Sequence, residues 1–102
     1  MSWHQIANLS ELSEDEAFPV SIGNDLVAVY KLKGQVFATS NVCTHQFALL
    51  SDGIVEDECV ECPLHQARFH VPTGKWQSGP SCGPLKTYPV RVEGGLVFVD
   101  AI

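Results

Sequence analysis

Two short runs of this chain combine a thiol with an imidazole, side chains that proteins use to bind soft and borderline metals. The runs are Cys43-Thr44-His45 and Cys62-Pro63-Leu64-His65, with residues 46–61 between them. Thiolate and neutral imidazole suit zinc or an iron–sulfur cluster, and they disfavour the hard cations magnesium and calcium. The spacing therefore predicts one metal centre, and its candidate ligands are Cys43, His45, Cys62 and His65.

Other interpretations of the same side chains stay open. An all-thiolate centre would use Cys43, Cys59, Cys62 and Cys82. It leaves both histidines unexplained and takes Cys82 from a distant Gly/Pro-rich loop. Alternatively, the mixed set holds a structural zinc, since two Cys and two His satisfy tetrahedral coordination. Cys59 and Cys62 also form a C-x-x-C motif. Because no strand-then-helix pattern accompanies the motif, Cys59 is predicted to be a buried free thiol on a short strand.

The composition excludes several classes of protein. The chain has 102 residues, 45% hydrophobic and 18% charged, which fits one domain with a modest core. Six basic and twelve acidic residues give a net charge of -6. This charge repels phosphate backbones and anionic lipids, so we expect neither nucleic-acid nor membrane binding, and it favours a partner with a basic docking face.

The amino-terminal residues and the cysteines indicate the compartment. Residues 1–5 contain neither a basic region nor a long apolar stretch, and no segment approaches the ~18 apolar residues of a spanning helix. We therefore expect a cytoplasmic protein. Its four cysteines are then predicted to be metal ligands or thiols rather than disulfides, because the cytosol is reducing.

Short segments with alternating polarity must position the ligands. Strand-forming residues fill the segments 17–22, 26–30, 36–39, 87–93 and 96–99. Turn signals separate them at Gly23-Asn24-Asp25, Lys33-Gly34 and Gly94-Gly95. The helical signal is a possible capping box at 8–11, and Pro19 prevents a long helix. The sequence predicts an all-β fold of antiparallel hairpins.

The middle of the chain differs from its two ends. From 41 to 84 the alternation weakens, Gly and Pro recur, and all four cysteines lie inside. We predict a strand-rich base of residues 1–40 and 85–102 that carries a loop-rich, cluster-binding insert of residues 41–84. Loops on a rigid scaffold can aim several side chains at one point, so the insert is the predicted site.

The paired motif resembles that of the Rieske iron–sulfur proteins. Cys-x-His, sixteen residues and Cys-x-x-His form their signature, and Arg68-Phe69 and Thr73-Gly74-Lys75 resemble the small Rieske-type ferredoxins of bacterial ring-hydroxylating oxygenase systems. The likeness runs from Trp3 to the carboxyl end. It implies a Rieske-type antiparallel β-sandwich base with the cluster-binding insert, and one [2Fe-2S] cluster per chain on Cys43, His45, Cys62 and His65.

The resemblance also implies a role in electron transfer. Such ferredoxins take single electrons from an NAD(P)H-dependent flavoprotein ferredoxin reductase. They pass them to a terminal Rieske oxygenase that hydroxylates an aromatic ring. We therefore expect an electron carrier rather than an enzyme, acting as a monomer, with the tip that carries His45 and His65 as its contact surface.

The residues around the motif predict a low potential for this class. With two thiolates and two neutral imidazoles the oxidised cluster has no net charge, so the class spans roughly -150 to +300 mV, above the four-Cys plant type. In high-potential relatives, the resemblance implies, a disulfide and two hydroxyl donors surround the cluster. The matching positions here are Ala48, Leu64, Ala67 and Phe69, which supply neither. We predict a midpoint in the lower part of the range.

Several other residues have two interpretations each. Phe47, Leu64 and Pro80 form either an apolar collar for docking or ordinary local packing. The acidic residues Asp52, Glu56, Asp57, Glu58 and Glu61 either steer a basic partner or are simply solvated. His4 and His70 are predicted to be surface histidines.

Two rival functions use the same residues. The first is a zinc-stabilised interaction module, which would be colourless. The second is a small Rieske-fold subunit of a larger reductase, such as a nitrite-reductase-like complex. Such subunits commonly lack the ligands, so the presence of all four here argues against this alternative.

Overall fold

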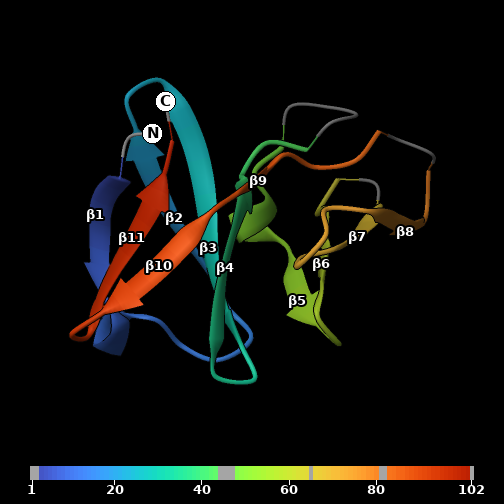
Figure 1. Ribbon diagram of the computed structural model, residues 1–102. Helices are drawn as coiled ribbons and strands as arrows, with labels where there is room; N and C mark the ends of the chain where they lie inside the picture. The colour runs from blue at the N-terminus through green and yellow to red at the C-terminus, as the bar shows by residue number, and fades with distance from the viewer. Residues whose placement is uncertain (1–2, 44–47, 65, 81–82, 102) are drawn as a thin grey trace.

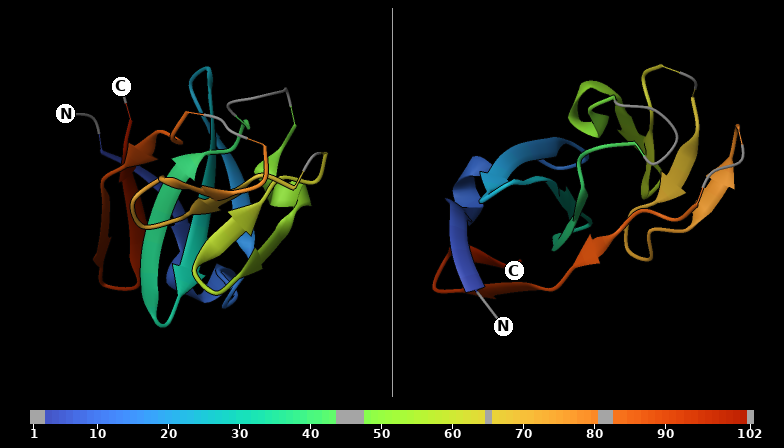
Figure 2. Two further views of the ribbon diagram at one scale, coloured as in Figure 1. Left: turned by 90° about the vertical axis from the view of Figure 1, so that its right-hand side faces the viewer. Right: turned by 90° about the horizontal axis from the view of Figure 1, so that it is seen from above.

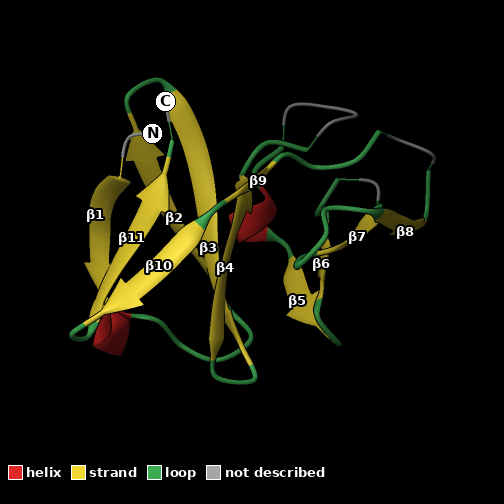
Figure 3. Cartoon of the chain, in the orientation of Figure 1, coloured by secondary structure: helices red, strands yellow, loops and turns green. Residues whose placement is uncertain are grey.

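The computed structural model describes residues 3–43, 48–64, 66–80 and 83–101. Three antiparallel sheets and two short 3₁₀ turns account for the regular structure of these residues, and none of them lies in an α-helix (Figures 1 and 3). The predicted all-β class is confirmed. None of the described segments forms a helix with the length and apolar character that a bilayer crossing requires.

Two sheets form the base. The first has the order β1-β11-β10 and consists of β1 (Trp3–Asn8), β10 (Val90–Glu93) and β11 (Leu96–Asp100). The second has the order β2-β3-β4-β9 and consists of β2 (Ala17–Ile22), β3 (Asp25–Leu32), β4 (Gln35–Ser40) and β9 (Thr87–Tyr88). The 3₁₀ turn η1 (Leu9–Glu11) follows β1. There the Asn8 N–H donates to Glu11 Oε1 over 2.7 Å, as the capping-box prediction requires.

The predicted hairpins form because their turns have the right residues. Leu32 pairs with Gln35 across Lys33-Gly34, and Glu93 pairs with Leu96 across Gly94-Gly95. All four turn residues have positive φ, between 50° and 78°. Two-residue turns of this kind match the right-handed twist of the strands they join, and glycine adopts them without steric cost.

The third sheet lies inside the predicted loop-rich insert. It has the order β5-β6-β7-β8, from β5 (Ile54–Glu56), β6 (Cys59–Glu61), β7 (Arg68–His70) and β8 (Trp76–Ser78), and the 3₁₀ turn η2 (Leu50–Asp52) precedes it. Seen from above, this sheet stands beside the two base sheets (Figure 2). Strands of three residues are too short to show alternation in a sequence. The sequence therefore predicted a loop-rich insert here and did not reveal the sheet.

Strand β3 joins the insert to the base because both of its faces are buried. Val27 and Val29 pack into the base core, which also contains Leu12, Ile22, Ala38, Tyr88, Val97, Val99 and Ala101. Ala28 and Tyr30 face the other way, into a second cluster. This cysteine cluster consists of Ala28, Tyr30, Leu32, Cys43, Ala48, Leu50, Val60, Cys62, Ala67, Phe69, Val71 and Leu85. The continuous apolar run of β3 is therefore a consequence of two-sided burial.

We predict that Tyr30→Phe lowers the free energy of unfolding by about 0.5–1.5 kcal/mol at neutral pH. The buried Tyr30 hydroxyl lies 2.9 Å from Thr39 Oγ1, and Thr39 donates to the Ser40 carbonyl, so Tyr30 is the donor of the pair. Burial raises the pKa of Tyr30 above its usual value of 10.0.

The difference in the free energy of unfolding between the wild type and Tyr30→Phe should also depend on pH. Because the fold favours neutral Tyr30, the wild type loses this part of its stability as the pH rises above about 10, where the unfolded tyrosine ionises. The variant has no such loss. Denaturant titrations should show the gap narrowing above that pH, and a constant gap would contradict the assignment.

Candidate metal centre

Cys43 lies at the start of a closed loop that follows β4. Its N–H donates to the Ala48 carbonyl over 2.9 Å, and Val42 bridges Leu49 just outside this bond. The buried Asn41 fixes this loop through two hydrogen bonds with Ser51. The Ser51 N–H donates to Asn41 Oδ1 over 2.8 Å, and Asn41 Nδ2 donates to Ser51 Oγ over 3.0 Å.

Cys62 starts a second closed loop, directly after β6. Its N–H donates to the Ala67 carbonyl over 2.8 Å, and the Gln66 N–H donates back to the Cys62 carbonyl over 2.9 Å. Gln66 has a φ of 60°, which closes the loop at some steric cost for a residue other than glycine. Both candidate thiol ligands therefore occupy equivalent positions, each at the base of a short closed loop.

The two cysteines share one environment. Both are buried, both belong to the cysteine cluster, and alanines (Ala48 and Ala67) close the two loops opposite them. A thiolate in apolar surroundings needs a positive partner, and a thiophilic metal supplies one. Two soft donors held on rigid backbone therefore fit an iron–sulfur cluster or zinc, and they do not fit a hard cation.

The histidine half of the predicted ligand set lies outside the described residues. This applies to His45 and His65, and also to Cys82 and Phe47. Within the described ranges, no three His, Cys, Asp or Glu side chains come close enough together to hold a metal ion. The structure thus places the two thiols in one buried cluster, and the imidazole ligands stay a prediction.

Cys59 belongs to a different surface from Cys62. Alternation along β6 and beyond buries Val60 and Cys62, whereas Cys59 and Glu61 are half-exposed. Across the sheet Cys59 pairs with Glu56 on one side and His70 on the other. The predicted short strand is confirmed, and the thiol, which takes part in no disulfide, is half-buried rather than buried. Its position on the opposite face argues against the all-thiolate centre and against a dithiol.

The acidic stretch contacts bases from other elements. Arg68 lies 3.3 Å from Glu61 and 3.9 Å from Glu56, and Lys33 lies 3.3 Å from Glu58. Burial alone would lower the pKa of Arg68, but hydrogen bonds and charge interactions with Cys59 and Glu61 raise it. These internal pairs offset part of the negative charge on this face.

The two predicted surface histidines differ from each other. His4 is exposed on β1, and its Nε2 lies 3.0 Å from the Ala101 carbonyl. His70 is half-buried: its Nδ1 lies 2.9 Å from Thr73 Oγ1, and its Nε2 lies 3.6 Å from Glu58. Because Glu58 also contacts Lys33 of the base, His70 belongs to a polar contact between insert and base that the sequence did not reveal.

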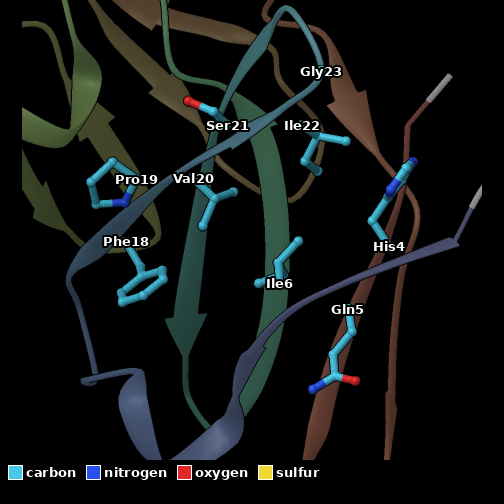
Figure 4. Close-up of a pocket in the computed structure, with 9 residues that line it drawn as sticks. All are labelled: His4, Gln5, Ile6, Phe18, Pro19, Val20, Ser21, Ile22 and Gly23. Atoms are coloured by element: carbon cyan, nitrogen blue, oxygen red, sulfur yellow. The ribbon is translucent and has the colours of Figure 1, made fainter.

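A groove on the base lies apart from the thiols. It has a volume of about 520 Å³ and runs between the outer edges of β1 and β2. Figure 4 shows Ile6, Phe18 and Val20 lining it, with His4 at one end. Its lining residues include no cysteine, so the groove is separate from the candidate metal centre.

Comparison with known proteins decides which metal centre these thiols serve. The model of the Rieske [2Fe-2S] domain matches residues 2–89. The chain belongs to the Rieske [2Fe-2S] family. Its cofactor is therefore one [2Fe-2S] cluster, and the zinc module is set aside.

The most similar relatives include Rieske ferredoxins. The naphthalene 1,2-dioxygenase ferredoxin component of Pseudomonas aeruginosa is 41% identical over 98 residues, 96% of this chain and 94% of the relative. The Sphingomonas yanoikuyae B1 ferredoxin matches with a TM-score of 0.93 at 34% identity, covering 99% of this chain and 100% of the other. This Rieske chain is thus a ferredoxin component that transfers electrons in an aromatic-ring dioxygenase system, and not its catalytic subunit.

One solved structure is a complex between an oxygenase and a ferredoxin. The complex of reduced oxygenase and oxidized ferredoxin in carbazole 1,9a-dioxygenase contains a chain that matches with a TM-score of 0.90 at 35% identity, covering 95% of this chain and 91% of the other.

Proposed function

We propose that this Rieske ferredoxin carries single electrons from an NAD(P)H-dependent flavoprotein reductase to a terminal Rieske oxygenase that hydroxylates an aromatic ring. The observation that carries the proposal is the burial of Cys43 and Cys62 in one cluster, each at the base of a closed loop. The oxygenase–ferredoxin complex of a relative supports the second step.

The proposed ligands divide between two irons. Cys43 and Cys62 would hold one iron, and His45 and His65 would hold the other. When bound, the cluster accepts and releases one electron. The chain supplies a fixed frame for this, because Asn41 and the two loop-closing backbone bonds hold the thiols in place. In this proposal residues 41–84 are the cluster-binding subdomain, and residues 1–40 and 85–102 are its scaffold.

The proposed contact surface is the loop that begins at Cys62. Leu64, next to the proposed ligand His65, is 61% exposed and is the most exposed large apolar side chain among the described residues. An exposed leucine beside the cluster suits a small, brief interface of the kind that redox partners form. The net charge of -6 would speed encounter with a partner whose docking face is basic.

The test is reconstitution with the reductase and oxygenase of a naphthalene or biphenyl dioxygenase system. We expect NADH-driven substrate hydroxylation to require this chain and to rise with its concentration. A Cys62→Ser variant serves as the matched control and should support no turnover. Purified protein that contains zinc in place of iron and sulfide would refute the proposal.

We predict a midpoint potential below about +100 mV, in the lower part of the class range. Ala48, Ala67 and Phe69, at three of the positions matched with high-potential relatives, are buried and carry no hydroxyl, so their side chains donate no hydrogen bond to cluster sulfur. Fewer such bonds leave the reduced form less stable. Potentiometric titration followed by visible absorbance measures this directly, and a higher midpoint would show that other donors are present.

A further inference from the structure

We infer that Trp76 is a positioning residue: it holds the Gly79-Pro80 segment against the loop that begins at Cys62, which keeps water from the cluster and lowers the potential. This inference rests on the proposed function, because it assumes that the loop carries a cluster ligand. Trp76 does not itself belong to the predicted ligand set, and its neighbours in sequence gave no reason to select it.

The position of Trp76 on the sheet brings it to this segment. Val55, Val60 and Phe69 form one row across β5, β6 and β7, and Trp76 continues the row on β8. Val60 and Phe69 are fully buried, so this is the sheet face that packs on the cysteine cluster. Trp76, at the sheet edge, is 40% exposed, and its indole Nε1 donates to the Pro80 carbonyl over 3.0 Å.

The segment held by Trp76 touches the backbone of the second closed loop. A Cβ on Gly79 would lie 2.6 Å from the Gln66 carbonyl oxygen and 2.8 Å from Ala67 Cα, closer than side chains approach. Gly79 also has a φ of 84°. Glycine is thus required for the contact, and the contact meets the same Gln66 and Ala67 that close the loop onto Cys62.

The same hairpin also holds the chain farther along, at Leu85. The Leu85 N–H donates to the Gly74 carbonyl over 2.8 Å, and a Cβ on Gly74 would collide with the Leu85 carbonyl. Gly74 lies in the turn between β7 and β8, and Trp76 lies on β8. The β7–β8 hairpin therefore holds the chain on both sides of residues 81–82. Leu85 is buried, whereas the hydrogen bond from Trp76 to the Pro80 carbonyl is exposed. The Trp76 hydrogen bond can therefore be removed with less damage to the fold.

The direction of the effect follows from charge. On two thiolates and two neutral imidazoles, the oxidised cluster is neutral and the reduced cluster carries one negative charge. Water stabilises a charge more than it stabilises a neutral centre. If the segment moves away and water enters, the reduced form becomes more stable relative to the oxidised form, and the midpoint potential rises.

The test compares Trp76→Phe with Trp3→Phe in the cluster-loaded protein. Phenylalanine keeps an aromatic ring at position 76 but cannot donate to Pro80, and Trp3, the other tryptophan, lies on β1 of the base against Arg91. At the wild-type midpoint, we expect Trp76→Phe to raise the ratio of reduced to oxidised protein about threefold, equivalent to about 28 mV for a one-electron couple. Trp3→Phe should leave the ratio unchanged.

A second pair covers the case in which Trp76→Phe does not fold. Gly79→Ala should also raise the ratio of reduced to oxidised protein. Gly83→Ala should leave the ratio unchanged, because a Cβ at Gly83 meets nothing within 4 Å. An unchanged ratio in Trp76→Phe or Gly79→Ala overturns the inference, even if the variant melts at a lower temperature. If the wild type itself holds no iron and sulfide, the proposed function has failed instead.

Discussion

Serine in place of Cys62 is expected to abolish the visible absorbance of the purified protein, with iron and labile sulfide falling to background. Cys62 is fully buried at the base of its loop, so solvent has little access to replace a lost thiolate there. A serine hydroxyl is a harder donor and stays protonated at neutral pH, so it binds iron poorly. Cys43→Ser should behave in the same way, as should His45→Ala and His65→Ala at the predicted ligand positions.

The matched control is Cys59→Ser, three residues earlier, on the strand β6 that ends just before Cys62. Cys59 is half-exposed, and its cross-strand neighbours are Glu56 and His70. This variant should keep full absorbance, and so should Cys82→Ser. Bleaching by either control would mean that the ligand set is wrong, and far-UV circular dichroism of all variants separates loss of the cluster from loss of the fold.

Phe69→Ala is expected to lower the free energy of unfolding by roughly 3–5 kcal/mol, the usual cost of emptying a buried aromatic site. Phe69 lies on β7 of the sheet in the insert, is fully buried, and belongs to the cysteine cluster that contains both thiols. Its β7 neighbour on the outer face is Arg68, whose side chain contacts acidic groups instead. The lower free energy of unfolding should therefore reflect weaker packing between the insert and the base.

Ile54→Ala is the control, because Ile54 lies in the same sheet but is 58% exposed. It should change stability by no more than about 0.5 kcal/mol. Chemical denaturation of both variants, made and measured with the cluster loaded, gives the two values under one condition. Equal losses in the two variants would mean that the insert sheet does not pack as the structure has it.

The sequence predicted those parts of the fold that local chemistry determines. The turns at Lys33-Gly34 and Gly94-Gly95 follow from residues that accept positive φ, and the strand-forming segment 26–30 lies within β3, although its burial on both faces was not predicted. The insert sheet could not be predicted in this way, because its strands are three residues long and only their pairing defines them.

The candidate site shows the same limit. Thiol and imidazole spacing pointed to Cys43 and Cys62, since ligand chemistry depends on residue type. The roles of Asn41 and Trp76 were missed, because each acts through hydrogen bonds to a single residue, Ser51 and Pro80 respectively, and residue types alone do not reveal these bonds. A polar residue immediately after a strand and ahead of a ligand, as at Asn41, was the one signal available.

Pulsed EPR of the reduced, purified protein tests the central claim most directly, because it identifies the atoms bound to the irons. We predict the signal of a paired-iron cluster with two distinct nitrogen donors on one iron, and the loss of the whole signal in His45→Ala and His65→Ala. A cluster with sulfur donors alone, or protein without a paired-iron signal, would contradict the account.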